Sequence, residues 1–523
     1  MKSAFVSHLN TNFVPSDEEI EVIQADIALR SQELADLDER IRELSAQRDE
    51  IHSYIEAHKA LISHPRRMPP DIVREIFLAC MPTHRNAVMS TQEAPLVLCR
   101  ICSAWRHIAL ATPSLWASLH IPLDFVLLNP QARMPAVARW FQLSGACPVS
   151  LTVLGEGLRY VKGDPLGISA FLKLLAASSA RWRSVKLADL SDAVALGLAD
   201  INTPILRSFS ASSTVQVLRR LGFLRTPSLY DATFEVDNGS DSSLEDEVLG
   251  MPLLWDQLAH LTFKVTSPGG LSLRTVLDLL SRCRQLISFQ SMITYVNDDD
   301  DRWANVKALS VPFLESLVIL EPCNLEPRAF GRFLELVSMP KLSLLHLATQ
   351  PSSTAADCYF LAALGTKSAP RIEDLAITMR SFIKDSLLKV LASLPSLKRL
   401  LVSNTVFSVE EETENSAPTD PEYLLALLTP GPATVCPMLQ ELTLKDCGSI
   451  AKEVLVSFVQ NRADFSAEFS RLQIVFQESQ TDELSLDEIL SFQERGVEVS
   501  LHYLYETART VQATAWAGLP TST

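Results

Sequence analysis

Two thiols, Cys99 and Cys102, have a type and spacing that could do chemistry. A Cys-x-x-Cys pair can begin a zinc site or act as a redox couple. No second pair and no His pair follows at zinc-finger spacing, and both thiols lie in an apolar helical pattern. We therefore expect them to pack as small hydrophobic groups, with no metal and no cofactor bound.

Catalytic motifs are missing from the sequence. It contains no Gly-x-Ser-x-Gly, no Gly-x-x-x-x-Gly-Lys-Ser/Thr, no His-Glu-x-x-His and no kinase signature. The ten His are dispersed, so a Cys–His or Ser–His pair formed only by folding has no support. Gly is scarce, at 17 residues, which argues against a Gly-loop nucleotide-binding protein. We expect the chain to be no enzyme.

Composition and charge exclude further classes of protein. The chain has 523 residues with 46 Lys and Arg against 62 Asp and Glu, a net charge of −16. This acidic balance argues against nucleic acid or an anionic membrane as the main partner. The nine Cys are scattered, and neither a signal peptide nor an apolar run long enough for a membrane span is found. We expect a soluble intracellular protein of the cytoplasm and/or nucleus.

Step by step from Ser16, apolar residues recur with alternating spacings of three and four. Ser16 and Glu19 form a capping box that marks the start of a helix. The pattern predicts a coiled-coil helix over residues 16–63 and a homodimer through it. One amphipathic helix lying on its own domain, or an antiparallel fold-back, are the alternatives. The seam positions are Ile20, Ile23, Ile27, Arg30, Leu34, Leu37, Ile41, Leu44, Arg48, Ile51, Ile55, His58 and Ile62.

Residues 65–120 read as three short helices. Pro70 and Asp71 suit a first helical turn, and an apolar stripe follows them. A polar connection over residues 82–93 leads to an apolar run over residues 95–109 and a last turn over residues 112–119. A segment of about 50 residues buries too little surface to be stable alone, so it needs a partner or a flanking domain. Trp105 and Trp116 are the kind of anchor that dominates interfaces.

The order of residues in this segment resembles an F-box. It reads Pro-x-Asp-Ile-x-x-x-Ile-Phe from Pro69, Ile-Cys-x-x-Trp-x-x-Ile-Ala from Ile101, and Pro-x-Leu-Trp from Pro113. The resemblance implies docking on the adaptor Skp1 of a cullin-based (SCF) ubiquitin ligase. Met68 and Asp71 stand where Leu and Glu are usual, and the 82–93 connection is longer than in minimal versions. The implied Skp1-binding residues are Pro69, Ile72, Ile76, Phe77, Cys102, Trp105, Ile108, Leu115 and Trp116.

Internal repeats decide the fold class of the remaining chain. The unit Pro-x-Leu-x-x-Leu-x-Leu begins at Pro312, Pro340, Pro370, Pro395 and Pro437, which are 28, 30, 25 and 42 residues apart. Weaker copies lie around Trp182, Leu206, Leu258, Leu286, Phe469 and Val499. Helical stripes alternate with them, at residues 271–283, 328–337, 385–394, 422–428, 450–461 and 486–494.

A short strand and a helix about every 28 residues is typical of leucine-rich repeats. The usual Asn or Cys after the third Leu is mostly missing, so the repeats are degenerate. We expect an α/β solenoid, an irregular leucine-rich-repeat horseshoe over residues 165–505, with a tail over residues 506–523; an ordinary α/β domain is the alternative. The acidic stretches at residues 235–248, 298–301 and 410–414 are interpreted as solvated loops rather than cation sites.

Outward side chains of such strands would line the concave face. The predicted target-binding residues are Leu344, His346, Asp374, Thr378, Arg399, Ser403, Glu441, Thr443 and Lys445, with Ala348, Ala376 and Leu401 on the same face. Their mixed chemistry suits protein recognition and identifies no particular ligand. The leading hypothesis is a substrate receptor that holds a target protein on the repeats while the ligase supplies the chemistry. A scaffold protein without a role in ubiquitination is the alternative.

Overall fold

The structure is a computed structural model in which the chain forms two compact units, Met1–Ile76 and Phe77–Thr523. The described residues are 5–62, 64–155, 168–188, 192–236, 244–265, 270–293, 307–320, 327–348, 371–378, 384–403, 421–431, 435–447, 449–476, 484 and 486–503. None of the helices in these ranges has both the length and the apolar character needed to cross a bilayer.

The first unit is dominated by one helix, α1 (Asp17–Leu61), of 45 residues. Its predicted start is confirmed, because the Ser16 hydroxyl accepts from the Glu19 backbone N–H and the Glu19 carboxylate accepts from the Ser16 N–H at 2.8 Å. The apolar stripe is open to solvent: Leu34 is 60 % exposed and Ile41 61 %. The unit also contains η1 (Val6–His8), α2 (His64–Arg67) and the beginning of α3 (Pro70–Ala79).

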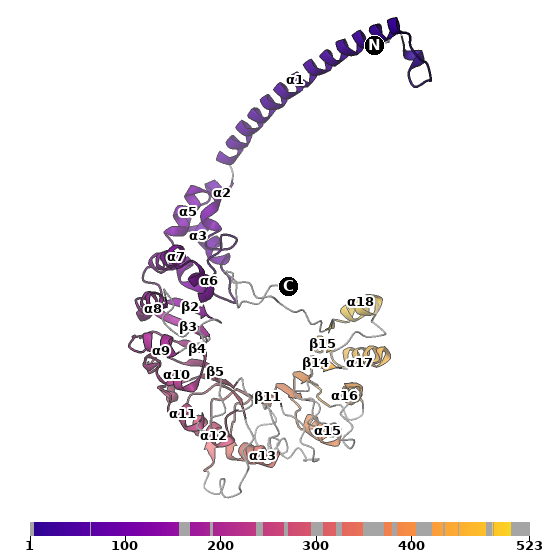
Figure 1. The fold of residues 1–523 in the computed structure, drawn as a ribbon. Helices are drawn as coiled ribbons and strands as arrows, with labels where there is room; N and C mark the ends of the chain where they lie inside the picture. The colour runs from indigo at the N-terminus through magenta and orange to yellow at the C-terminus, as the bar shows by residue number, and fades with distance from the viewer. Residues whose placement is uncertain are drawn as a thin grey trace. The chain divides into compact units, whose positions relative to one another are not determined.

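The second unit is built on one parallel sheet, which has 14 strands in the described part of the chain. The helices lie along one side of the strands (Figure 1). The predicted leucine-rich-repeat-like solenoid is therefore confirmed as the fold of this unit. In sheet order, the strands are β1 (Ser118–Pro122), β2 (Val149–Leu154), β3 (Trp182–Ala188), β4 (Ser208–Ser213), β5 (Asp231–Val236), β6 (His260–Val265), β7 (Ser288–Met292), β9 (Ser316–Leu320), β11 (Leu344–Ala348), β12 (Asp374–Thr378), β13 (Arg399–Ser403), β14 (Glu441–Cys447), β15 (Arg471–Phe476) and β16 (Glu498–Tyr503).

One row of apolar side chains runs in register through every strand of this sheet. Side chains two positions apart along a strand share a face, so each strand presents this row to the helices. All members except the last are buried. The row consists of Leu119, Leu151, Val185, Phe209, Ala232, Leu261, Phe289, Leu317, Leu345, Leu375, Leu400, Leu442, Leu472 and Val499.

Helices cover the apolar row, and the six predicted helical stripes are confirmed as helices α12 to α18. A separate two-stranded parallel sheet is formed by β8 (Leu309–Ser310) and β10 (Val337–Ser338). The helices from the end of α3 onward are α4 (Leu98–Ile101), α5 (Ser103–Leu110), α6 (Leu123–Leu128), α7 (Pro130–Leu143), α8 (Ile168–Ala176), α9 (Asp192–Gly197), α10 (Val215–Arg219), α11 (Leu244–Leu249), α12 (Leu273–Arg282), α13 (Pro327–Leu336), α15 (Lys384–Ala392), α16 (Pro421–Leu428), α17 (Lys452–Phe465) and α18 (Leu486–Glu494). Short 3-10 turns are η2 (Pro113–Trp116), η3 (Ser179–Arg181), η4 (Gly222–Leu224) and η5 (Trp255–Gln257).

The array begins earlier than its predicted start at residue 165. Strands β1 and β2 already belong to the sheet, and β1 starts inside the segment over residues 65–120 that was expected to be purely helical. Pro113-x-Leu115 precedes β1, but Leu119 follows Leu115 by four residues instead of three, and no Pro-x-Leu precedes β2, so the repeat frame did not reach either strand. At the other end, β16 stops at Tyr503, close to the predicted limit at residue 505.

One of the three predicted acidic loops is wrong in its boundaries. Glu235 lies in β5, where its carboxylate is 3.7 Å from the Lys264 amine, and residues 244–248 lie in α11. The alternating Ala232, Phe234 and Val236 place this stretch in the sheet despite its acidic side chains. The stretches at residues 298–301 and 410–414, and the tail at residues 506–523, lie outside the described residues.

A buried arginine stabilises the turn before β14. Arg462 on α17 is fully buried, and its guanidinium donates to the Val435 carbonyl at 2.8 Å and the Cys436 carbonyl at 3.1 Å. Cys436 has φ 52°, a left-handed conformation that exposes these carbonyls to the arginine. Burial lowers the pKa of Arg462, which offsets part of this stabilisation. The predicted helical stripe over residues 450–461 ended one residue before this arginine.

We expect Leu345→Ala to lower the free energy of unfolding by about 2–5 kcal/mol, because it leaves a cavity in the middle of the apolar row. Leu344→Ala, one residue earlier and half-buried on the opposite face, is the matched control and should cost about 1 kcal/mol or less. Urea unfolding followed by far-UV circular dichroism measures both changes. Equal losses would contradict the assignment of the two faces.

Candidate functional site

The first F-box-like positions lie on α3 and just before it. Pro69 is exposed and its carbonyl accepts from the Val73 N–H at 3.1 Å, which begins the helix. Ile72 and Ile76 are four residues apart and therefore share one face of α3. Both are unusually exposed for isoleucine, at 48 % and 36 %. They form an accessible apolar pair.

The later F-box-like positions divide into buried and accessible groups. Phe77, Leu115 and Trp116 are buried, with no more than 2 % exposed, and form part of the second unit's own core. The Trp116 indole N–H donates to the Ala109 carbonyl at 2.9 Å, and its ring meets that of Trp140 edge-on at 4.8 Å. These three predicted adaptor contacts therefore have a packing role within the chain.

Cys102, Trp105 and Ile108 are half-buried and partly accessible. The Trp105 ring packs edge-on against Phe77, with centroids 5.1 Å apart. This contact covers part of the indole and leaves the rest of its surface accessible to solvent. Of the two tryptophan anchors that the sequence emphasised, Trp105 is thus partly accessible to a partner, whereas Trp116 is buried.

The apolar run over residues 95–109 forms two helices instead of one. Cys102 is extended, with φ −157° and ψ 170°, and separates α4 from α5. Its sulfur accepts from the Trp105 N–H at 3.4 Å and so takes the N-cap position that Ser or Asp usually occupies. Burial raises the pKa of the Cys99 thiol, an effect that the nearby Arg106 partly opposes. Within the described ranges, no group of three or more His, Cys, Asp or Glu side chains is placed to hold a metal ion.

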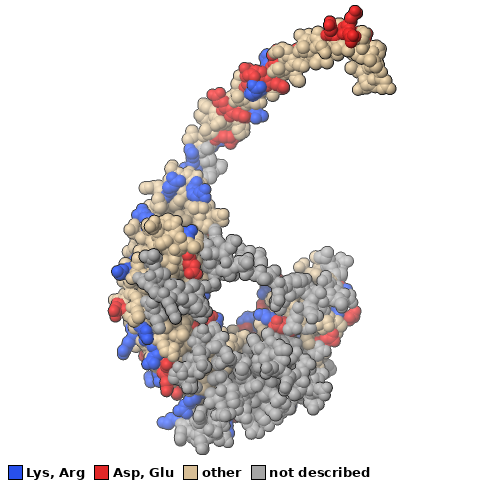
Figure 2. Space-filling view, viewed as in Figure 1, with Lys and Arg blue, Asp and Glu red and all other residues tan. Residues whose placement is uncertain are grey.

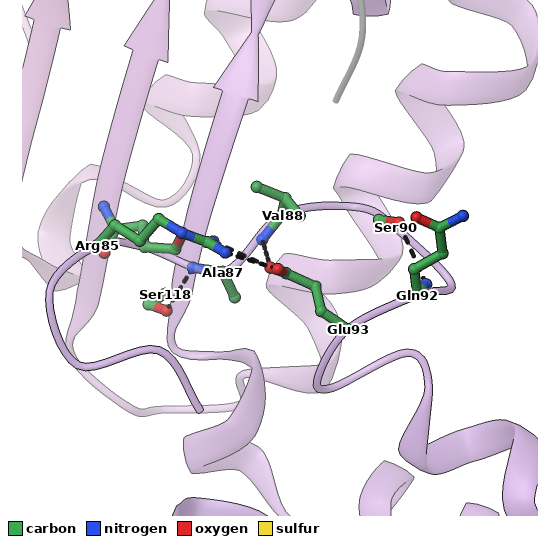
Figure 3. Close-up of polar contacts among 8 residues, drawn as sticks. Arg85, Ala87, Val88, Ser90, Gln92, Glu93 and Ser118 are labelled. Carbon is green, nitrogen blue, oxygen red and sulfur yellow. Dashed lines mark hydrogen bonds and ion pairs between the residues drawn. The ribbon is translucent and has the colours of Figure 1, made fainter. Parts of the chain in front are cut away.

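The long connection over residues 82–93 folds onto the edge of the sheet (Figure 3). Arg85 and Glu93 form a bidentate ion pair with N···O distances of 2.6 and 3.0 Å. The same carboxylate accepts from the Val88 N–H at 3.2 Å. The hydrogen bonds that Arg85 donates to Glu93 raise the pKa of Arg85. Both side chains are only about one-fifth exposed, so this pair is less screened by water than a surface pair.

The connection extends the sheet by one short bridge. Val88 pairs in parallel with His120 of β1, and the His120 N–H donates to the Ala87 carbonyl at 2.7 Å. The Ala87 N–H in turn donates to the Ser118 hydroxyl (Figure 3), and the Asn86 amide reaches Thr152 of β2 at 2.8 Å. The connection therefore covers the edge of β1 that no other described strand pairs with.

The predicted target-binding residues lie on the sheet face opposite the apolar row. Leu344, His346, Asp374, Ser403, Glu441 and Thr443 are half-buried, and Arg399 and Lys445 are exposed. The side chains of Ala348 and Thr378, the last residues of their strands, lie outside what the structure describes. Burial lowers the pKa of His346, and the positive charge of Lys445 lowers it further. The Ser403 hydroxyl donates to the Asp446 carboxylate at 2.9 Å.

This face carries a row of alternating charges that the sequence analysis recognised only in part. Asp374, Arg399, Glu441, Arg471 and Glu498 are register partners on five successive strands. The Arg399 guanidinium donates two hydrogen bonds to Asp374, and Arg471 donates to Glu498 at 3.0 Å. The hydrogen bonds that Arg399 donates to Asp374 raise the pKa of Arg399. The charges largely neutralise one another, so this face favours a polar protein surface over a strongly charged ligand.

Comparisons with known proteins give little further information. No family model and no curated protein matches the chain. Among solved structures, a crystal structure of a TLR13–ssRNA13 complex matches 62 % of this chain and 45 % of that chain, with 13 % sequence identity and a TM-score of 0.32. The chain thus spans less than half of the length of that protein.

We expect Glu93→Ala to detach the connection from β1. The change removes the Arg85 ion pair and the acceptor of the Val88 N–H. It should lower the free energy that holds the connection on β1 by about 1–3 kcal/mol. Hydrogen exchange of the Val88 and His120 amides should become roughly tenfold faster or more. Gln92→Ala, an exposed neighbour whose side chain makes none of these bonds, is the control and should leave exchange unchanged. Unchanged exchange in Glu93→Ala would refute the structural role of the connection.

Proposed function

We propose that this chain is an F-box substrate receptor of an SCF ubiquitin ligase. The observation that carries the proposal is the exposed pair Ile72 and Ile76, which stands at the first-helix contact positions of the F-box-like motif. Exposed isoleucines on one helix face are a ready contact for an adaptor. Trp105 and Ile108 add accessible apolar surface on α5. The proposed adaptor is Skp1, which would link the chain to a cullin ligase.

In this proposal the solenoid holds the target protein and the chain itself catalyses nothing. The face opposite the apolar row offers polar and self-paired charged side chains from several strands, which suits a folded protein surface. Ubiquitin transfer would then follow from proximity, because the bound target is held near a charged conjugating enzyme. The identity of the target is set by outward side chains such as His346, Thr443 and Lys445.

The exposed seam of α1 supports a second element of the proposal. Ten Ile and Leu side chains at heptad spacing would pack against a second copy of the helix and remove apolar surface from water. A dimer would carry two target-binding arrays and so gain avidity for targets with repeated sites.

A scaffold without a role in ubiquitination is the second candidate function. It is favoured by the burial of Phe77, Leu115 and Trp116 and by the pairing of Val88 with β1. In that case the F-box-like segment would serve as the N-terminal cap of the array, as terminal segments of repeat proteins do. Binding of Skp1 distinguishes the two functions.

The double variant Ile72→Glu with Ile76→Glu should lower the amount of Skp1 that co-purifies with the full-length chain tenfold or more. The reason is that two carboxylates would be desolvated in the apolar contact. Both positions are exposed, so the fold should be retained, as circular dichroism can show. Leu78→Glu, on the same helix, 38 % exposed and outside the motif, is the matched control. Undiminished Skp1 capture by the double variant, or no capture by the unaltered chain, would favour the scaffold.

Leu37→Lys with Leu44→Lys should convert a dimer of the full-length chain into a monomer, since each lysine would place a charge on the seam. Sedimentation equilibrium measures the mass directly. Ala25→Lys with Ala46→Lys, on the outer face of the same helix, is the control and should remain dimeric. A monomeric unaltered chain would end the dimer hypothesis and leave the Skp1 proposal intact.

A further inference from the structure

An apolar cavity of about 520 Å³ lies between the F-box-like helices and the first helices of the array. The segment just before α4, together with α5, η2, α6 and α7, supplies its walls. They include Leu96, Leu110, Trp116, Phe125, Trp140 and Leu143. Leu110 is 38 % exposed, so the cavity opens to solvent. This volume is in the range of pockets that accept a small molecule or a large side chain.

Three arginines line the same cavity: Arg106, Arg133 and Arg139. Arg106 donates to the Cys99 carbonyl at 2.7 Å, Arg133 donates to the Phe125 carbonyl and stacks on that ring at 3.6 Å, and Arg139 reaches the Gln142 amide oxygen at 3.4 Å. All these acceptors are neutral. No carboxylate of the described residues forms an ion pair with any of the three.

This arrangement differs from that on the open sheet face. The chain has a net charge of −16, and the arginines of that face, such as Arg399 and Arg471, are paired with carboxylates. Figure 2 shows Lys and Arg side chains spread along the second unit, with acidic side chains among them. Uncompensated arginines around an apolar cavity attract an anionic group and hold it by charge-assisted hydrogen bonds.

From these observations we infer that the cavity binds a short acidic peptide segment of a partner protein, with one large apolar side chain in the cavity and flanking carboxylates on the arginines. The cavity walls supply the apolar contact and the arginines fix the orientation of the peptide. A nucleic acid or an anionic membrane fits less well, because its extended negative charge would also meet the acidic side chains outside the cavity, whereas a short peptide segment can be confined to the three arginines. Neither Ile72 nor Ile76, the proposed adaptor contacts, lines this cavity.

The test uses the full-length chain and a fluorescein-labelled peptide, Glu-Glu-Asp-Trp-Glu-Glu-Leu-Glu, measured by fluorescence anisotropy. Saturable binding is expected. Replacing Trp and Leu of the peptide by Ser, or all of its acidic residues by Lys, should each weaken binding roughly tenfold or more. Equal binding of all three peptides would overturn the proposal, as would no binding of the first.

Two variants of the protein locate the site. Arg106→Gln with Arg139→Gln removes two exposed charges, and Leu110→Glu places a carboxylate at the mouth of the cavity; each should weaken binding roughly tenfold. Arg284→Gln, an exposed arginine after α12, is the matched control and should bind normally. Skp1 capture should be unchanged in all of these variants.

Three results would contradict the site. Unaltered peptide binding in both cavity variants would place the peptide elsewhere. Loss of Skp1 capture together with peptide binding would make the cavity part of the adaptor contact. Binding of anionic phosphatidylserine vesicles that the variants abolish, without an effect on the peptide, would identify a membrane ligand instead.

Discussion

The row of buried apolar side chains that runs from Leu119 to Val499 is the constraint on which the second unit depends. A single strand and helix cannot bury its apolar face, so each repeat is stabilised by its neighbours on both sides. Register follows from the same row, because a shift by one residue would turn every leucine toward solvent. The opposite face is then free to vary, which is where the charged row from Asp374 to Glu498 lies.

A stacked sheet of this kind has two ends, and an unpaired end invites association with other chains. At the first end, the connection before α4 supplies Val88 as a bridge to β1 and fixes it with the Arg85–Glu93 ion pair. The F-box-like residues Leu115 and Trp116, in η2 directly before the same strand, are buried. The segment that resembles an F-box therefore covers this end of the array. This packing explains why Leu115 and Trp116 of its motif are buried.

Much of this architecture could be predicted from the sequence, because leucine spacing depends only on neighbouring repeats. The strands at Pro312, Pro340, Pro370, Pro395 and Pro437 and the helices between them follow directly from the pattern. The capping box at Ser16 and Glu19 likewise depends on local hydrogen bonds. In contrast, β2 lacks Pro-x-Leu, and β1 and β5 have Ser118 and Ala232 where the repeat expects the next Leu, so pairing with their neighbours is what places these strands in the sheet.

The candidate sites were predictable to a smaller extent, because burial and charge pairing depend on residues far apart in the sequence. The motif predicted both Phe77 and Trp105 as adaptor contacts. In the structure the two rings pack against each other, and Phe77 is buried whereas Trp105 is partly accessible. The pairing of Arg471 with Glu498 and the carbonyl contacts of Arg462 arise only when distant repeats are adjacent.

The arginines give the clearest example of how the fold distributes charge. On the open sheet face, strand register places carboxylates beside Arg399 and Arg471, so charge there stabilises the array and adds little attraction for a ligand. Around the cavity between α5 and α7, the arginines meet only carbonyl and amide oxygens. Hydrogen bonds to neutral acceptors orient a guanidinium without cancelling its charge. Among the described residues, these three arginines therefore keep an uncancelled positive charge beside the cavity, in a chain whose net charge is −16.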